Sequence, residues 1–594
     1  MNSNVNWDLD SIFAGGSHSA ALADYLAQIT ADIATAEGQP LPEILTLETQ
    51  AGWVQAIQAW YGLVARLRQA GSFVGCLVSQ NVKDDKALQW QSQIEVLSAR
   101  LGTIWTRYQA AFARQDDVAW QALTRHTELN GVAFHLDEER DLARQKMPPE
   151  LETLANELAT DGYHAWQRLY NITSGDKEVE FEGQPKSLGQ LQSKFYDDPD
   201  RETRQAAFEL FETAWAELAK TCAMALNFQA GFRLTLYKHR GWDSILHEPL
   251  LNNRYSQETL EAMWSVIEAK SGKLLDYFQA KARLLGTEKL AWYDVEAPVG
   301  EVNKTFTYDE AAHFVVDHVH TVNPDIAAYC QMAIDKHWIE AEDRPGKRAG
   351  AYCTGLPVTQ ESRIFMTYNG SYNGMLTLAH ELGHGYHGWV MRDLPYAARW
   401  YTMSLAETAS TFNEAIVRDA SYKASSSDQE RLGILATKLN DATAFLMNIR
   451  ARYDFEREFF KQRREQQLSV DELNDLMLSA QKTAYKDGLA QYHPLFWASK
   501  LHFYITRAPF YNFPYTFGFL FSNGVYAQAE AEGPSFRDRY VALLRDTGSM
   551  KTEALAQTHL GVDLTQPAFW ETAVDRVLAD VDEFVALAEK VAGT

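Results

Sequence analysis

The sequence predicts a mainly α-helical protein with one short zone of β-structure. Proline, which breaks helices, accounts for only 17 of the 594 residues. Apolar residues recur at helical spacing along most of the chain, whereas strand-like and turn-like segments concentrate between residues 288 and 375. We therefore expect a large helical fold with a small β-sheet in the middle of the chain.

The first clear element is a pair of long helices that form an antiparallel hairpin. Each carries an apolar stripe on one face, and turn signals from Asn81 to Asp85 separate the two. The first stripe consists of Trp53, Ile57, Trp60, Tyr61, Val64 and Leu67, and the second of Leu88, Ile94, Leu97, Leu101, Ile104, Trp105 and Tyr108. We interpret both helices as scaffold, because stripes at this spacing are usually core.

A change of pattern between residues 170 and 190 marks the expected end of this N-terminal helical region. Two turn-rich stretches, 171–176 and 182–185, flank short β-like pieces. We therefore predict an N-terminal helical region over residues 1–190 and a second domain over residues 191–594. In the second domain, helix patterns resume at Ser193 and continue to about Ala282.

The expected β-zone contains three segments, 290–295, 344–353 and 362–370. In the last of them Ile364, Met366 and Tyr368 alternate with their neighbours, which is typical of a short strand with one buried face. Beyond residue 375 the pattern predicts helices almost to the end of the chain. One of these helices should begin at a capping box formed by Ser469 and Glu472.

Charge and cysteine content exclude several classes of function. The formal net charge is −24, and such a surface repels phosphate backbones and anionic lipids, so we expect neither nucleic acid nor membrane as a partner. No signal peptide or run of 18 apolar residues is present, which predicts a cytoplasmic protein. The four cysteines are too widely spaced to suggest a disulfide framework or a thiolate zinc site: Cys76, Cys222, Cys330 and Cys353.

The segment 374–387 contains the pattern H-E-x-x-H. Because His380 and His384 are four residues apart, they lie one turn apart on the same face of a helix. Both imidazoles can then direct a nitrogen toward one Zn²⁺, at about 2.0–2.1 Å. Glu381 is offset by about 100° around the helix, where its carboxylate can accept a proton from the attacking water. The pattern predicts a zinc site with Glu381 as the catalytic general base.

A catalytic zinc of this kind needs a third protein ligand and an open position for water. The next helix, expected to begin at Met403, offers two carboxylates on nearly the same face, Glu407 and Glu414. Spacing alone leaves the choice between them open. We interpret His387, one turn beyond the motif, as a residue that lines the cleft or supports a ligand rather than a ligand itself.

A second unusual patch, rich in tyrosine, occupies residues 501–518. Hydrolysis of an amide develops negative charge on the carbonyl oxygen, which a phenol or an imidazole can stabilise by a hydrogen bond. Tyr511 and Tyr515 are four residues apart, and His502 lies just upstream. We consider these three residues as candidates for this catalytic role. The alternative interpretation is a packed aromatic core beside a helix.

The two metal-ligand segments resemble those of a known family. The sequence Thr377-Leu-Ala-His-Glu-Leu-Gly-His, followed by Ala406-Glu-Thr-Ala-Ser, is similar to the M3 peptidases, which are thimet oligopeptidase-like, and above all to their oligoendopeptidase F branch. The opening segment 7–13 and the stretch 509–518 resemble that branch as well. The similarity extends over nearly the whole chain.

The resemblance implies a two-lobed helical shell around a deep substrate channel, with one Zn²⁺ per chain and a small β-sheet near the active site. It also implies cleavage of short peptides, because a narrow channel excludes folded proteins. The third metal ligand of the family matches Glu407, and its transition-state stabilisers match Tyr511, Tyr515 and His502. The segment 350–353 and the strand around Phe365 resemble the edge that aligns the substrate backbone.

These observations predict a zinc-dependent endopeptidase that acts on short oligopeptides, with residues 191–594 as its catalytic domain; they do not predict an oligomeric state. A carboxypeptidase or dipeptidyl carboxypeptidase is the nearest alternative. It would need a cation to bind the C-terminal carboxylate, for which Arg348, Arg363 and Arg507 are candidates. A peptide-binding protein without catalytic activity is the alternative from another functional class.

Overall fold

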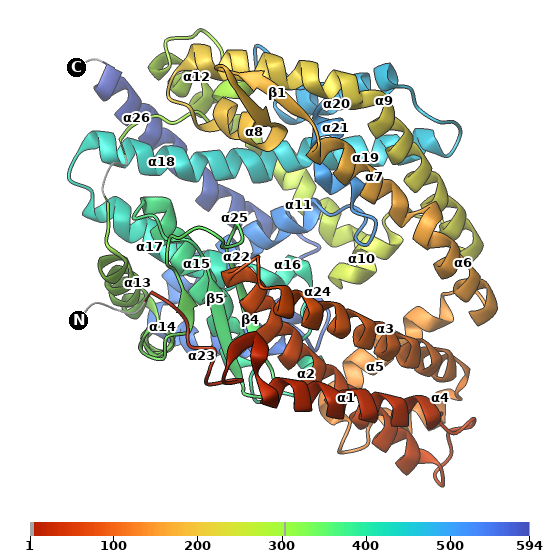
Figure 1. Cartoon of the computed structure of the whole chain (residues 1–594). Helices are drawn as coiled ribbons and strands as arrows, with labels where there is room; N and C mark the ends of the chain where they lie inside the picture. The colour runs from red at the N-terminus through yellow and green to blue at the C-terminus, as the bar shows by residue number, and fades with distance from the viewer. Residues whose placement is uncertain (1–4, 302–304, 593–594) are drawn as a thin grey trace. The chain divides into compact units, whose positions relative to one another are not determined.

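The computed structural model describes residues 5–301 and 305–592. The fold is mainly α-helical, as predicted, and the described strands form only two small sheets (Figure 1). No helix in the described ranges combines the length and the apolar character needed to cross a membrane. The chain divides into two compact units, each assembled from three separate segments of the sequence. We describe each unit by itself.

The first unit comprises Met1–Lys146, Asn303–Ala420 and Gln528–Gly561. Its elements are α1 (Ala20–Gly38), α2 (Gln50–Gln80), α3 (Asp85–Arg114), α4 (Asp117–Thr124), α5 (Ala133–Arg144), α13 (Tyr308–Val322), α14 (Pro324–Asp335), β3 (Ile339–Glu340), β4 (Tyr352–Leu356), β5 (Glu361–Phe365), α15 (Tyr372–Val390), α16 (Met403–Ala406), most of α17 (Ser410–Ala424), α23 (Arg537–Asp546) and α24 (Thr552–Leu560).

The second unit comprises Met147–Val302, Ser421–Ala527 and Val562–Thr594. Its elements are α6 (Pro149–Gly162), α7 (His164–Gly175), β1 (Glu178–Phe181), β2 (Gln184–Ser187), α8 (Leu188–Asp197), α9 (Arg201–Arg240), α10 (His247–Asn253), α11 (Gln257–Lys270), α12 (Leu274–Leu284), α18 (Asp428–Thr443), α19 (Ile449–Arg463), α20 (Val470–Ala484), α21 (Phe496–Ser499), most of α22 (Phe513–Glu532), α25 (Pro567–Leu578) and α26 (Asp580–Ala592).

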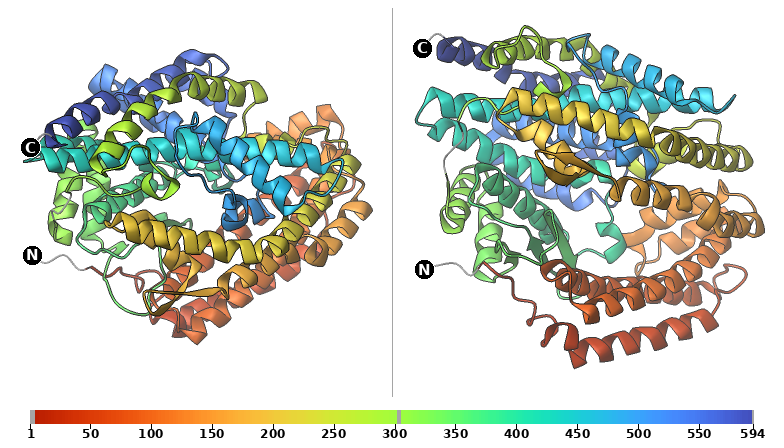
Figure 2. Two further views of the ribbon diagram at one scale, coloured as in Figure 1. Left: turned by 90° about the horizontal axis from the view of Figure 1, so that it is seen from above. Right: turned by 45° about the horizontal axis from the view of Figure 1, so that its top comes forward.

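The predicted helical hairpin is confirmed as α2 and α3, which pack side by side among the red and orange helices of Figure 2. The aromatic rings of the two stripes meet in the core, where Trp60 stacks on Trp105 with ring centroids 3.9 Å apart. Asp84 caps α3 by accepting a hydrogen bond from the backbone of Ala87 at 2.9 Å. This hairpin is the support on which the small sheet of the first unit packs.

That sheet has the order β3-β5-β4, with β5 parallel to β3 and antiparallel to β4. Both α2 and α15 pack against β4 and β5. The expectation of one buried face around Ile364 is therefore wrong. Residues 362–365 are buried on both faces, because β5 is the central strand and helices cover the sheet. The strand also ends at Phe365, before Met366 and Tyr368.

The β-zone expected between residues 288 and 375 contains less β-structure than predicted. The segment 290–295 forms a short 3₁₀-helix and one isolated bridge rather than a strand. Two helices, α13 and α14, lie in the middle of the zone. Their start signals are present in the sequence, since Thr307 and Glu310 form a capping box and Asn323 caps a helix that has proline at its first position.

In the second unit, α9 is a 40-residue helix, yellow in Figure 2, against which α7, α8, α19 and α20 pack. The hairpin of β1 and β2 occupies the turn-rich stretch identified near residue 180. The capping box of Ser469 and Glu472 is confirmed at the start of α20. The domain boundary at residue 190 and the deep substrate channel remain predictions.

Candidate metal centre

Helix α15 carries the H-E-x-x-H pattern along the surface of the small sheet. It begins at Ser371, whose hydroxyl accepts a hydrogen bond from the backbone of Gly374 at 3.0 Å. The helix continues without interruption through the motif, so His380 and His384 project from consecutive turns, and their ring centroids lie 4.8 Å apart. The helical geometry predicted for this pair is confirmed.

Glu407 does not lie within a helix, contrary to the expectation of one continuous helix from Met403. The four-residue helix α16 ends at Ala406, and α17 begins at Ser410. Glu407 therefore sits in the turn between two helices, where the Ser410 hydroxyl donates a hydrogen bond of 2.7 Å to its Oε2. This break separates Glu407 from Glu414, which would share a face only on a single helix.

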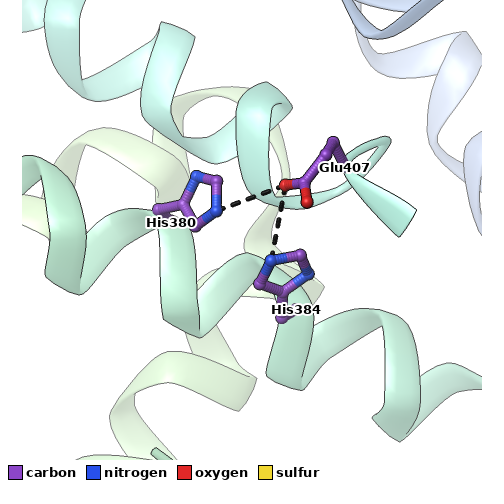
Figure 3. A group of neighbouring side chains, drawn as sticks. All are labelled: His380, His384 and Glu407. Atoms are coloured by element: carbon purple, nitrogen blue, oxygen red, sulfur yellow. Dashed lines mark ion pairs between the residues drawn. The ribbon is translucent and has the colours of Figure 1, made fainter. Parts of the chain in front are cut away.

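The side chains of His380, His384 and Glu407 converge on one point (Figure 3). Glu407 Oε2 lies 3.3 Å from His380 Nε2 and 3.4 Å from His384 Nε2. Three ligands of a tetrahedral zinc site with bonds of about 2.0–2.1 Å are separated by about 3.3 Å. The two imidazoles and the carboxylate thus fit a zinc ion in both chemistry and spacing.

Glu414 contacts the other nitrogen of the first histidine. Its Oε2 lies 3.1 Å from His380 Nδ1, and Arg418 on the same helix donates to its other oxygen. A carboxylate at Nδ1 fixes the orientation of the ring and keeps Nε2 available for a metal. Glu407 thus faces the Nε2 nitrogens of both histidines, whereas Glu414 contacts Nδ1 of His380. Sequence spacing alone did not make this distinction.

The three carboxylates of this site differ in pKa: two have lowered values and the third has a raised value. Burial raises the pKa of Glu407 and Glu414, but hydrogen bonds and charge attraction from His380 and, for Glu414, from Arg418 outweigh this and lower both values to about 2. Burial instead raises the pKa of Glu381 to about 7, because its opposing attraction to His380 is weaker. A carboxyl group whose pKa lies near neutral pH suits proton transfer.

The pKa values of His380 and His384 are also shifted in opposite directions. Burial disfavours the charged form of both, but hydrogen bonds to Glu407 and Glu414 raise the pKa of His380 to about 10. Burial dominates for His384 and lowers its pKa to about 4. His380 thus holds a proton that lies between its nitrogen and an oxygen of Glu407. A divalent cation can take the place of that proton.

Glu381 is buried, and its Oε2 has no hydrogen-bond partner among the described residues. A buried carboxylate oxygen without a partner is costly in a fold alone. The same residue lines a cavity of about 780 Å³ in the first unit, together with His380, His384 and Glu407. An unpaired carboxylate oxygen beside the triad is what a general base for a bound water requires.

His387 does not line this cavity, which corrects one of the two interpretations from sequence. It is fully buried, with Nε2 2.9 Å from Thr547 Oγ1 and 3.2 Å from the carbonyl oxygen of Leu544. Its ring stacks on Tyr401 at 4.2 Å. The turn beyond His384 thus points toward α23, because that face of α15 packs on another helix.

Tyr511, Tyr515 and His502 lie in the second unit, where they form one group. The phenol oxygens of the two tyrosines are 3.1 Å apart, and His502 stacks on Tyr511 with ring centroids 5.3 Å apart. Tyr515 is in α22, whereas Tyr511 precedes the helix. Burial, reinforced by Arg452 and Lys500, lowers the pKa of His502 to about 3, so its imidazole is neutral.

Sequence reasoning missed a small residue that shapes the site. Gly383, inside the motif, lies against the turn that carries Glu407, and a Cβ at this position would be 2.4 Å from the carbonyl oxygen of Ala409. The close approach of α15 to this turn therefore requires glycine. The sequence shows the glycine, but it does not show that Ala409, 26 residues later, packs against it.

The cations considered for a carboxypeptidase do not line the cavity. Arg363 is fully buried and paired with Glu361 at 2.9 Å, Arg348 lies outside the lining, and Arg507 belongs to the second unit. Three other arginines line it instead, Arg68, Arg392 and Arg399. Arg68 comes from α2, which the sequence indicated only as scaffold.

Comparison with known proteins places the chain in a family. A family model described as Peptidase family M3 matches residues 195–576, and one described as Oligopeptidase F matches residues 112–178. Oligopeptidase PepF of Bacillus subtilis (strain 168) is 26% identical over 411 residues, which are 67% of this chain and 59% of that protein. An oligoendopeptidase F homolog of Borreliella burgdorferi is 22% identical over 97% of both chains.

The chain thus spans about three fifths of the length of the Bacillus relative that it matches, and 65% of a chromosomal oligoendopeptidase F of Lactococcus lactis. Solved structures share the fold over almost the full length. A protein of Chlamydophila abortus matches with a TM-score of 0.84, 18% identity and 98% coverage of both chains. The oligoendopeptidase-F of Enterococcus faecium matches with a TM-score of 0.69 and 18% identity, over 96% of this chain and 99% of that one. Because the M3 model covers well over half of the sequence, the chain belongs to peptidase family M3.

Proposed function

We propose that the protein is a zinc-dependent endopeptidase that hydrolyses internal bonds of short peptides. The observation that carries this proposal is the convergence of His380, His384 and Glu407 at tetrahedral spacing, next to a buried glutamate without a partner. Membership of the M3 family and the similarity to proteins named oligoendopeptidase F support it.

In this proposal His380, His384 and Glu407 hold one Zn²⁺, which supplies a Lewis acid that polarises the scissile carbonyl and acidifies a water. Glu381 accepts a proton from the attacking water and later returns it to the leaving amine. Its unpartnered Oε2 beside the triad supports both steps, because this oxygen is available to take up and release a proton. Glu414 orients His380 through Nδ1.

The small sheet offers a binding surface for an extended peptide. Among the described strands β4 is at the edge of its sheet, and Tyr352, Cys353, Gly355 and Leu356 line the cavity. A peptide that pairs with an edge strand gains backbone hydrogen bonds without regard to its sequence. This supports short, unfolded peptides as substrates.

We assign stabilisation of the developing oxyanion to Tyr511, Tyr515 and His502. Their grouping supports treating them as one functional set: Tyr515 donates to the Tyr511 hydroxyl, which leaves the Tyr511 phenol and the neutral imidazole of His502 as donors. We also propose residues 191–594 as the catalytic domain and 1–190 as a helical region. The gap between the two matched family segments, 179–194, supports that boundary.

The test is cleavage of a quenched fluorescent peptide of about eight residues, blocked at both ends, before and after treatment with a chelator and after addition of zinc. We expect internal cleavage that the chelator abolishes and zinc restores. Glu381→Gln should retain bound zinc and lose activity by at least about 10³-fold. Glu95→Gln, an exposed residue on α3, is the matched control and should behave as wild type.

Near-wild-type turnover by Glu381→Gln would overturn the assigned mechanism. Cleavage only of peptides with a free C-terminus would favour the carboxypeptidase alternative. Zinc binding and peptide binding without any cleavage would favour the peptide-binding alternative.

A further inference from the structure

The cavity beside the triad carries unpaired positive charge. Its lining includes three arginines, Arg68, Arg392 and Arg399. The carboxylates in the lining are committed elsewhere, since Glu361 pairs with Arg363, and Glu381 and Glu407 belong to the metal centre. Within the described ranges no carboxylate oxygen lies within 4.0 Å of the three arginines. In a chain with a net charge of −24, such a group is unusual.

Arg68 and Arg392 keep most of their donors available. Arg68, exposed on α2, makes only a long 3.4 Å contact with the hydroxyl of Thr354 on the edge strand. Arg392 follows α15 and stacks on Trp389, with its guanidinium carbon 3.7 Å from the ring centroid, while one nitrogen donates to the Trp389 carbonyl at 2.6 Å. Stacking fixes the plane of a guanidinium and leaves its edge free for an anion.

Arg399 is closer to the protein interior. Its Nε donates to the carbonyl oxygen of Leu394 at 2.9 Å, and burial lowers its pKa. Burial raises the pKa of Tyr396, and the charges of Arg68 and Arg399 both oppose this. The two guanidiniums therefore lie near the same phenol, which also lines the cavity.

One further acidic group that acts on these arginines is already neutralised by another residue. Asp393 influences both Arg392 and Arg399, but its two oxygens accept hydrogen bonds from Arg545 at 2.7 and 3.0 Å. A bidentate pair of this kind satisfies the carboxylate. The three cavity arginines consequently lack an anion of their own in the described structure.

We propose that Arg68, Arg392 and Arg399 form a cationic subsite that binds a carboxylate of the peptide. The carboxylate is either an aspartate or glutamate side chain or the C-terminal carboxylate. The planar fork of arginine donates two parallel hydrogen bonds to a carboxylate, and a partly desolvated site strengthens them. The inference rests on the proposed function, since it assumes that the cavity holds peptide, and it identifies peptides that place a carboxylate at this subsite as the favoured substrates.

Binding tests the subsite independently of turnover. Labelled peptides of about eight residues, with glutamate, glutamine or lysine at each position in turn, are titrated by fluorescence anisotropy into zinc-loaded Glu381→Gln protein. We expect the best glutamate peptide to bind about tenfold more tightly than its glutamine counterpart at low salt. The difference should shrink toward twofold at about 0.5 M salt, because salt screens a charge pair that is only partly desolvated.

Variants assign the effect to residues. Arg68→Gln, Arg392→Gln and Arg399→Gln should each reduce the glutamate preference by at least about threefold, without changing the affinity for the glutamine peptide. Arg66→Gln is the matched control, since Arg66 lies on the same helix and pairs with Asp32 at 2.6 Å. If Arg399→Gln does not fold, as judged by circular dichroism, the more accessible Arg68 and Arg392 carry the test.

Peptides with amidated and free C-termini distinguish the two sources of the carboxylate. A preference for glutamate over glutamine that persists in amidated peptides identifies an acidic side chain. Tighter binding of free than of amidated peptides, without a glutamate preference, identifies the terminal carboxylate. Equal binding of glutamate and glutamine peptides, together with equal binding of free and amidated peptides, overturns the subsite. Cleavage of the neutral peptide by wild-type protein is measured in parallel, and its absence contradicts the proposed function while the binding ratio still decides the subsite.

Discussion

Contacts of single side chains orient the residues of the candidate metal centre. Glu414 contacts Nδ1 of His380, on the opposite side of the ring from Glu407, and Arg418 pairs with it in turn. This chain of contacts fixes the imidazole plane, so that Nε2 faces the point where His384 and Glu407 converge. Glu414, which is outside the candidate triad, thus orients one of the three candidate ligands.

We expect Glu414→Ala to weaken zinc binding by about 10–100-fold, because the ring of His380 loses its fixed orientation. Glu414→Gln, which keeps an acceptor oxygen, should recover part of the loss. Competition with a chromophoric chelator measures the affinity, and Glu95→Gln again serves as control. Unchanged affinity in both variants would mean that helix packing alone orients the ring.

A second buried carboxyl, in the second unit, should make stability depend on pH. Burial raises the pKa of Glu456 to about 8, although Asn512, Arg233, Arg452 and the Phe510 backbone favour the charged form. The folded value exceeds the unfolded one, so the folded state holds an extra proton between about pH 4.5 and 8. Stability from this group is therefore full below that window and is lost as pH rises through it.

Glu456→Gln removes this dependence because glutamine cannot ionise. Relative to wild type, the variant should gain about 1–3 kcal/mol in its free energy of unfolding between pH 5 and pH 8. Urea titrations at several pH values measure the difference. A difference that stays constant with pH would show that Glu456 is ionised in the folded protein throughout this range.

At the scale of elements, the metal centre depends on how closely two segments approach. Helix α15 carries two of the candidate ligands, and the turn between α16 and α17 carries the third. Gly383 allows the contact, since its Cα faces the backbone of Ala409 and Ser410. Asn413 adds a long hydrogen bond of 3.5 Å to the carbonyl oxygen of Ala379 on the same helix.

Gly383→Ala should therefore force α15 and this turn apart. We expect a loss of about 1–3 kcal/mol in stability and weaker zinc binding, because the new methyl group meets backbone atoms that cannot move aside. Gly388→Ala, on the same helix with open space around its Cβ position, is the matched control. It should be neutral or stabilise by up to about 1 kcal/mol. Thermal unfolding of both variants separates the effect of the steric clash from the effect of helix propensity.

Element type was easier to predict than element position. The hairpin of α2 and α3 follows from apolar periodicity over several turns of each helix, whereas α13 and α14 were hidden between turn-rich segments. Strand β5 was expected to alternate, but a central strand under two helices is buried on both faces. Short apolar runs do not reveal which neighbours will cover them.

For the whole molecule, the dominant long-range term is net charge. The chain carries 79 acidic and 55 basic residues, and the resulting self-repulsion opposes the compact state. We expect the melting temperature of the zinc-loaded protein to rise by a few degrees between about 0.02 and 0.3 M NaCl, as salt screens this repulsion. Potassium chloride should act equally, which separates screening from specific ion binding. A falling melting temperature would mean that attractive ion pairs outweigh the net repulsion.

The sequence alone predicted the helical class and singled out His380, His384 and Glu381 as candidate ligands and candidate base, because these depend on spacing within one or two turns of a helix. Tertiary structure decided the rest. It separated Glu407 from Glu414 by breaking a helix between them, turned His387 away from the cavity, and brought Arg68 beside residues more than 300 positions later in the chain. Periodicity records which face of a helix is buried, but packing between distant segments sets what that face meets.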